Sequence, residues 1–126
     1  MDVSDNILTA GLALRKVILG IPGLGTDRIF PISVRVEQPM PFVTFFRSLL
    51  EEGAVKAQEG PRTAHFVVQI YSGEWSQGVD IASRIASYLD GYRDDHITIC
   101  RLEDAVENFD PTIPAYVQIL SFKVKK

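Results

Sequence analysis

The chain has 126 residues and a formal net charge of −3; hydrophobic residues make up 46% of it and charged residues 23%. These values are near the averages for globular domains, so they exclude disordered, collagen-like and coiled-coil proteins. No apolar run approaches the roughly 20 residues of a membrane span, and neither a signal peptide nor a basic nucleic-acid-binding surface is expected. We therefore expect one domain over residues 1–126.

The first helix is expected over residues 4–19. Its apolar side chains recur at helical spacing, and Gly20 followed by Pro22 ends the pattern. Residues 20–41 are rich in glycine and proline, which indicates an ordered loop with a short extended piece at Arg28–Phe30 or Ser33–Glu37.

Five further elements follow in chain order. Aromatic and β-branched residues predict strands over residues 42–50 and 62–71, and alternation of apolar side chains is clearest in the second of them. Helical spacing returns over 74–90, and two more strands are expected over 97–106 and 115–124. Between the last two strands, 108–114 has the composition of a turn-rich connection.

The predicted order is α-β-β-α-β-β. We interpret it as an α+β fold with an antiparallel-rich, four-stranded sheet and both helices packed on one face. The expected core combines one face of each helix with alternate strand positions. Its members are Leu14, Phe66, Val68, Ile70, Val79, Ile85, Leu89, and Ile119 or Val117.

Residues that could carry chemistry are few. Gly20, Gly23 and Gly25 follow a helix instead of a strand, so they favour a helix end and a turn over a phosphate-binding loop. His96 and Cys100 are four apart in an expected strand, about 13 Å, which is too far to share a metal ion. His65 has no carboxylate partner nearby in sequence, so a packed or edge position is expected for it.

A reactive thiol and an aromatic platform are two further candidate sites. Cys100 is the only cysteine, which excludes an internal disulfide and favours a small buried residue. An aromatic platform for single-stranded RNA would need Phe45, Phe46, Phe66 and Tyr71 on one surface with basic neighbours. Since only Arg47 and Arg62 are available on those strands, core packing is the favoured interpretation.

Several segments together resemble the small tail-completion, or tail-terminator, proteins of long-tailed bacteriophages and prophages. They are the leucine-rich first helix, Thr26–Pro31 in the loop, Pro41–Phe45 at the first strand, Arg62–Ser72 running into the second helix, and the last strand at Tyr116–Val124. The resemblance extends over nearly the whole chain.

The resemblance implies a structural virion protein without catalysis, cofactor or metal. Such proteins form a ring, usually a hexamer, on the head-proximal end of the tail tube, where they stop tube polymerisation and present the surface that joins the head. The implied partners are further copies of the chain, the tail-tube protein and a head-completion or connector protein, with no sequence-specific nucleic acid and no membrane. The implied location is the virion tail, reached from the bacterial cytoplasm, where the free chain could be a monomer.

The residues between the first two strands, 51–61, contain three glutamates and little to bury. We expect them to be mobile in the free protein and ordered on assembly. Glu51, Glu52 and Glu59 are candidates for an acidic or neutral ring lumen, because a lumen that binds phosphates would slow the passage of DNA; alternatively, they only keep a loop soluble. The competing functions are a small α+β ligand-binding or regulatory domain without catalysis and an accessory subunit of an enzyme.

Overall fold

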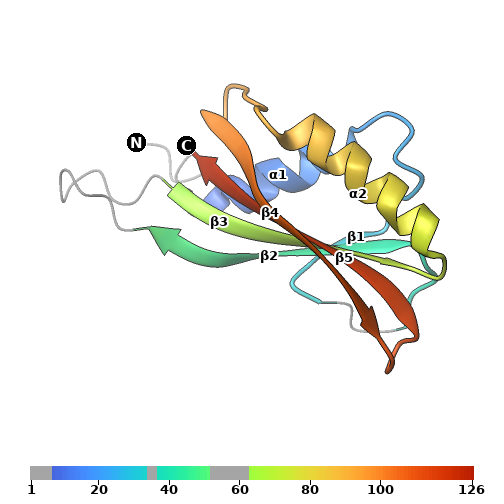
Figure 1. Cartoon of the computed structure of the whole chain (residues 1–126). Coiled ribbons are helices and arrows are strands. Elements are labelled where there is room, and N and C mark those ends of the chain that lie inside the picture. Colours follow the sequence, from blue (N-terminus) through green and yellow to red (C-terminus); the bar gives the residue numbers. More distant parts are fainter. Residues whose placement is uncertain (1–6, 34–36, 52–62) are drawn as a thin grey trace.

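The computed structural model describes residues 7–33, 37–51 and 63–126. These ranges form two α-helices and a five-stranded sheet, in the order α-β-β-β-α-β-β (Figure 1). After a short 3-10 turn at Ile7–Thr9, the elements are α1 (Ala10–Leu19), β1 (Ile29–Pro31), β2 (Phe42–Glu51), β3 (Thr63–Ser72), α2 (Trp75–Leu89), β4 (Ile99–Asp110) and β5 (Ala115–Lys125). No described helix has the length and apolar character needed to cross a bilayer.

The sheet has one strand more than the four expected from the sequence. Its order is β1-β2-β3-β5-β4, in which β1 runs parallel to β2 and every other pair is antiparallel. The added strand is the extended piece expected near Arg28–Phe30. Three residues are too few for an alternating pattern, and β1 forms because it pairs with Val43–Phe45 of β2.

The fourth strand also differs from its expected bounds of 97–106. It extends to Asp110, so the connection to β5 contains only residues 111–114. Asn and Asp disfavour strands in isolation, but Asn108 and Asp110 pair here with Val117 and Ala115 of β5. Pairing across the hairpin therefore overrides the local turn propensity of this segment.

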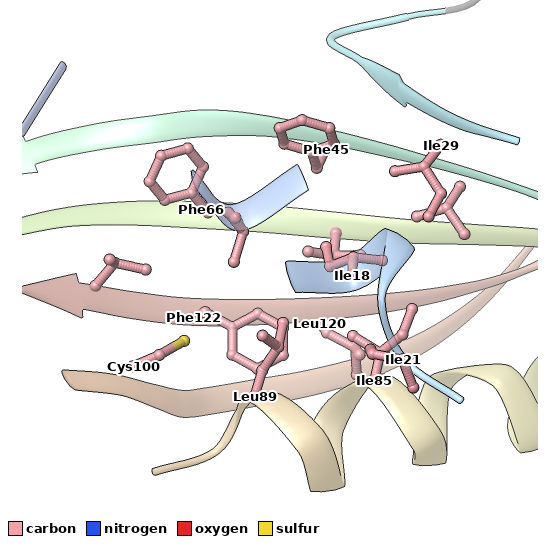
Figure 2. Close-up of a cluster of buried hydrophobic side chains, with 14 of the residues drawn as sticks. Ile18, Ile21, Ile29, Phe45, Phe66, Ile85, Leu89, Cys100, Leu120 and Phe122 are labelled. Carbon is pink, nitrogen blue, oxygen red and sulfur yellow. The ribbon is translucent and has the colours of Figure 1, made fainter. Parts of the chain in front are cut away.

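One hydrophobic cluster joins both helices to a single face of the sheet (Figure 2). Leu14 and Ile18 of α1 and Ile85 and Leu89 of α2 are fully buried in it. The strands supply alternate residues, mainly Val43, Phe45, Phe66, Val68, Ile70, Leu120, Phe122 and Val124. The expectation that both helices cover one face is confirmed.

The expected core is correct for β3 and wrong for β5. Ile119 is half-buried, and Val117 is buried outside the helix-covered cluster. Pairing with β3 decides which side chains of β5 point toward the helices. In this register Phe66 lies opposite Phe122 and Val68 lies opposite Leu120. A shift of one residue moves every side chain of a strand to the other face, and both faces of β5 are apolar enough to allow either choice. Val79 is also only half-buried.

Gly78 allows α2 to approach the end of β3 closely. A Cβ atom at this position would lie 2.5 Å from Oγ of Ser72. That hydroxyl is buried and donates a hydrogen bond to the backbone oxygen of Glu74, just before the helix. The tight turn from β3 into α2 thus depends on a residue without a side chain.

Candidate functional site

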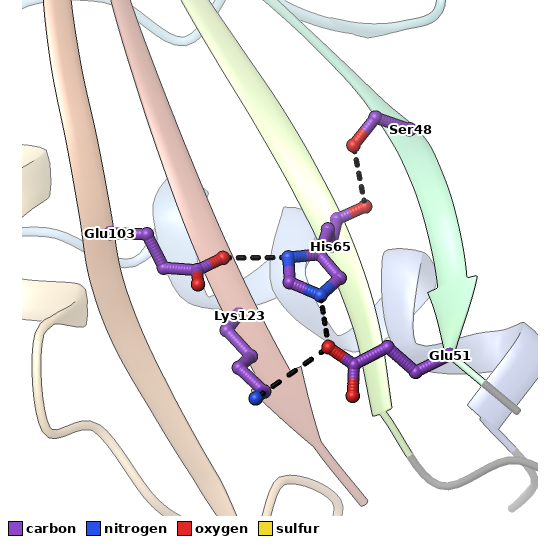
Figure 3. A network of polar contacts seen from close by, with 5 residues as sticks. All are labelled: Ser48, Glu51, His65, Glu103 and Lys123. Atoms are coloured by element: carbon purple, nitrogen blue, oxygen red, sulfur yellow. Dashed lines mark hydrogen bonds and ion pairs between the residues drawn. The ribbon is translucent and has the colours of Figure 1, made fainter. Parts of the chain in front are cut away.

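The helix-free face of the sheet carries a polar network centred on His65 of β3 (Figure 3). Nε2 of His65 lies 2.6 Å from Oε1 of Glu51 at the end of β2, and Nδ1 lies 2.6 Å from Oε1 of Glu103 in β4. Nζ of Lys123 in β5 lies 3.6 Å from the same Glu51 oxygen. The network therefore connects the four longest strands of the sheet.

The two carboxylates favour the protonated form of His65. Both ring nitrogens can donate to a carboxylate only when both carry a proton. The hydrogen bond with Glu51 raises the pKa of His65 above its ordinary value, while burial opposes this rise and Glu103 adds to it. The same hydrogen bond lowers the pKa of Glu51. With His65 protonated, the network of His65, Glu51, Glu103 and Lys123 has no net formal charge.

Two irregularities in strand register position these groups. The pairing of β4 with β5 shifts between Leu102 and Asp104, which leaves Glu103 as the extra residue of a bulge. The pairing of β2 with β3 shifts between Arg47 and Leu49, so Ser48 is the extra residue there. Local sequence does not reveal the network, because the partners of His65 are 14 and 38 residues away and only the strand pairing brings them together.

This arrangement does not resemble a hydrolytic triad. In such a triad the imidazole accepts the proton of a nucleophile at one nitrogen. Here both nitrogens of His65 face carboxylates, and the Ser48 hydroxyl donates to the His65 backbone oxygen at 3.4 Å and not to the ring. No group of three or more potential metal ligands occurs in residues 7–33, 37–51 and 63–126.

Of the three glutamates proposed for a lumen, the structure places Glu51 in the network with His65. Glu52 and Glu59 lie outside the described residues, as does nearly all of the 51–61 connection that was expected to be mobile. His65, which was expected to be a packed or edge residue, lies instead on the central strand β3 with two carboxylate partners from distant parts of the chain.

The remaining candidate residues are separated. Cys100 is fully buried, and burial raises the pKa of its thiol to about 12, so the thiol is in its unreactive form at neutral pH. Gly23 and Gly25 have positive φ angles in the turn after α1. Phe45 and Phe66 are buried under the helices, whereas Tyr71 stacks on Phe42 on the other face, with ring centroids 4.7 Å apart. The four aromatic side chains therefore form no common platform.

Two of the segments on which the resemblance rests, Thr26–Pro31 and Pro41–Phe45, are in direct contact. The Thr26 hydroxyl donates a hydrogen bond to the backbone oxygen of Pro41 at 2.9 Å, and Nε of Arg28 donates to those of Pro39 and Pro41. The N–H of Val43 donates to the backbone oxygen of Arg28. Thr26–Pro31 and Pro41–Phe45 thus form one structural unit at the edge of the sheet.

Comparison with known proteins finds a likeness in fold. No protein-family model and no curated protein sequence matches the chain. Among solved structures, the chain is similar to one described as "Virion of native gene transfer agent (GTA) particle", with a TM-score of 0.72 and 11% sequence identity over 98% of this chain and 96% of that one. At this identity the match shows a shared fold over essentially the full length of both chains.

Proposed function

We propose that the protein is a structural component of a phage-like virion. The observation that carries the proposal is the fold shared with a chain of a gene transfer agent virion over 98% of this chain. Because a fold by itself does not determine function, the proposal also depends on the segments that resemble tail-completion proteins, two of which pack together at the β1–β2 edge.

Within the virion, the proposed role is to cap the head-proximal end of the tail tube as a ring, end tube polymerisation and provide the surface for head–tail joining. The edges of the sheet offer a means of self-association. The outer side of β4 has no strand partner among the described residues, and β1 covers β2 only at Val43–Phe45. Unpaired edges of this kind can be extended by a strand from another chain.

The lumen assignment remains part of this proposal. The carboxylate of Glu51 is paired with His65 and Lys123, so the described part of the acidic cluster adds little net charge. Such a surface is close to neutral, and it would not retain the phosphates of DNA in transit.

The alternative of a small ligand-binding domain has weaker support. The two hollows beside α1 have volumes of about 260 and 280 Å³. These volumes are below the usual range of roughly 300–1,000 Å³ for small-molecule pockets. Neither hollow brings together several polar groups that lack partners.

The proposal is tested by mixing the purified chain with the tail-tube protein of the same phage-like element. We expect tubes to stop growing at one end and a ring to be visible there by electron microscopy. A matched control omits the chain or replaces it with an unrelated protein of similar size and charge. Tubes that elongate unchanged with the chain in excess, with no ring on any end, would contradict the proposed role.

A further inference from the structure

The β4–β5 hairpin ends in an apolar and acidic surface. Phe109, Ile113 and Tyr116, named here the hairpin tip, are 46%, 41% and 38% exposed, and the rings of Phe109 and Tyr116 meet edge to face at 5.2 Å. Trp75 at the start of α2 is 53% exposed beside them and donates a hydrogen bond to Glu107. Large apolar side chains gathered in this way are typical of an interaction surface.

The part of this hairpin nearest the tip carries charge of one sign. Residues 102–122 contain four acidic side chains and no basic one. Asp110 lies directly beside the tip, where its carboxylate accepts a hydrogen bond from the backbone of Thr112. A partner for the tip should therefore offer apolar surface together with positive charge.

A surface of this kind is present beside α1 of the same chain. Two hollows, of about 260 and 280 Å³, share Ala13, Lys16 and His96 and form what we call the α1 groove. Leu12, which is 70% exposed, and Lys126 line the first hollow.

The second hollow of the groove contains two tyrosines and one carboxylate. Tyr88 and Tyr92 stack with ring centroids 5.8 Å apart. Asp94 accepts hydrogen bonds from the Tyr92 hydroxyl and from the backbone N–H groups of His96 and Ile97, so its charge is engaged within the chain.

The two surfaces lie at opposite ends of the molecule. β5 starts beside the hairpin tip, and its other end, next to the C-terminus, lies on the far side of the molecule (Figure 1). The last residues of the chain there include Lys123, Lys125 and Lys126, of which Lys126 lines the groove. A chain cannot join its own two ends, so the contact can form only between copies. Repetition of such a head-to-tail contact gives a closed ring or an open filament.

We propose that the hairpin tip of one copy sits in the α1 groove of the next, with Phe109, Ile113 and Tyr116 against Leu12 and with Asp110 facing Lys16. This inference rests on the proposed function and specifies the contact that closes its ring. It explains why α1 exposes Leu12 on the side away from the core.

Cysteine cross-linking tests the contact directly. Leu12→Cys protein is mixed with Ile113→Cys protein under mild oxidation; the native Cys100 is fully buried and does not interfere. The expected product is a disulfide-linked dimer of one chain of each kind. The matched control pairs Leu12→Cys with Leu49→Cys, a position that is 55% exposed on β2. A yield no higher than that of the control would overturn the proposed contact.

Charge reversal tests the pairing of Asp110 with Lys16. Asp110→Lys and Lys16→Glu should each weaken self-association by about tenfold, as measured by sedimentation, and the double variant should restore it. Glu37→Lys, an exposed reversal outside both surfaces, should leave the association unchanged.

The outcomes separate this inference from the proposed function. Rings that cap tubes and are insensitive to both reversals would leave the function standing and overturn the hairpin–groove contact. A double variant that fails to recover would overturn the specific pairing. Cross-linking between the tip and the groove without tube capping would support the contact and contradict the tail-completion role.

Discussion

The two faces of the sheet are built in different ways. On the helix-covered face, side chains such as Leu14, Ile70 and Phe122 are 0% exposed and join in one apolar cluster. The helix-free face combines the stacked rings of Phe42 and Tyr71 with partnered polar groups, among them the His65 network and the hydrogen bond from Thr44 to Gln69. Apolar burial is non-directional, whereas a polar contact depends on its partner.

The difference indicates which face of the sheet can contact another chain directly. The covered face is occupied by α1 and α2 and cannot accept another chain without unfolding. The helix-free face remains accessible, and the polar side chains of the His65 network on it already have partners within the chain. The strand edges also remain accessible, and the outer side of β4 has no strand partner among the described residues. Substitutions on the two faces should therefore differ in size and in their dependence on pH.

The largest effect is expected at Leu14. Leu14→Ala leaves a cavity between α1 and the sheet and should lower the free energy of unfolding by about 2–5 kcal/mol. Leu12→Ala on the exposed side of the same helix should change it by less than about 0.5 kcal/mol. Urea denaturation monitored by circular dichroism measures both, and equal effects would show that the assignment of faces is incorrect.

A somewhat smaller effect is expected where α2 meets β3. Gly78→Ala places a Cβ atom 2.5 Å from the Ser72 hydroxyl, and overpacking of this kind should cost about 1–3 kcal/mol. Because Ser72→Ala removes the oxygen, the double variant should be more stable than the sum of the two single effects predicts. Gly20→Ala, where the nearest atoms are 3.5 Å away, is the control. If the effects of Gly78→Ala and Ser72→Ala on the free energy of unfolding were additive, the close contact between these two positions would not be the cause of the destabilisation.

On the helix-free face, the hydrogen bond between Thr44 and Gln69 gives the next test. The hydroxyl of Thr44, a residue only 3% exposed, donates to Oε1 of Gln69 at 3.1 Å. Gln69→Leu should cost about 1–2 kcal/mol because the Thr44 hydroxyl is left buried without this acceptor. Thr44→Val combined with Gln69→Leu should be more stable than Gln69→Leu alone in thermal denaturation, because only the Tyr71 hydroxyl, which donates to the same oxygen at 3.4 Å, then lacks this acceptor. A double variant as unstable as the single one would argue against this hydrogen bond.

The smallest effect is a dependence of stability on pH. The pKa of His65 is raised in the folded chain above the ordinary value of 6.5. The stabilisation by His65 should therefore be complete below that value and be lost as the pH rises through the raised pKa. Unfolding free energies measured from below pH 6.5 upward should show this fall.

Substitutions in the network identify the residue that causes this pH dependence. His65→Gln should remove the fall in stability, Glu103→Gln should reduce it, and His96→Gln should leave it in place. A profile unchanged in His65→Gln would place the titrating group elsewhere in the chain.

The sequence by itself determined the two helices, the four long strands and most of the core on α1, β3 and α2. These elements have strong local patterns: period 3.6 in the helices and strict alternation in β3. The resemblance to tail-completion proteins and the suggestion of a ring came from the same residues. For the candidate site, the sequence pointed to Glu51 but assigned no partner to it.

Tertiary structure decided the features that depend on strand pairing. The three residues of β1 extend the sheet only because β2 lies beside them, and β5 turns Leu120 and Phe122 toward the helices because of its register with β3. The His65 network and the α1 groove also depend on tertiary structure, because each brings together residues that are far apart in the chain. Local sequence does not encode which strand will lie beside which.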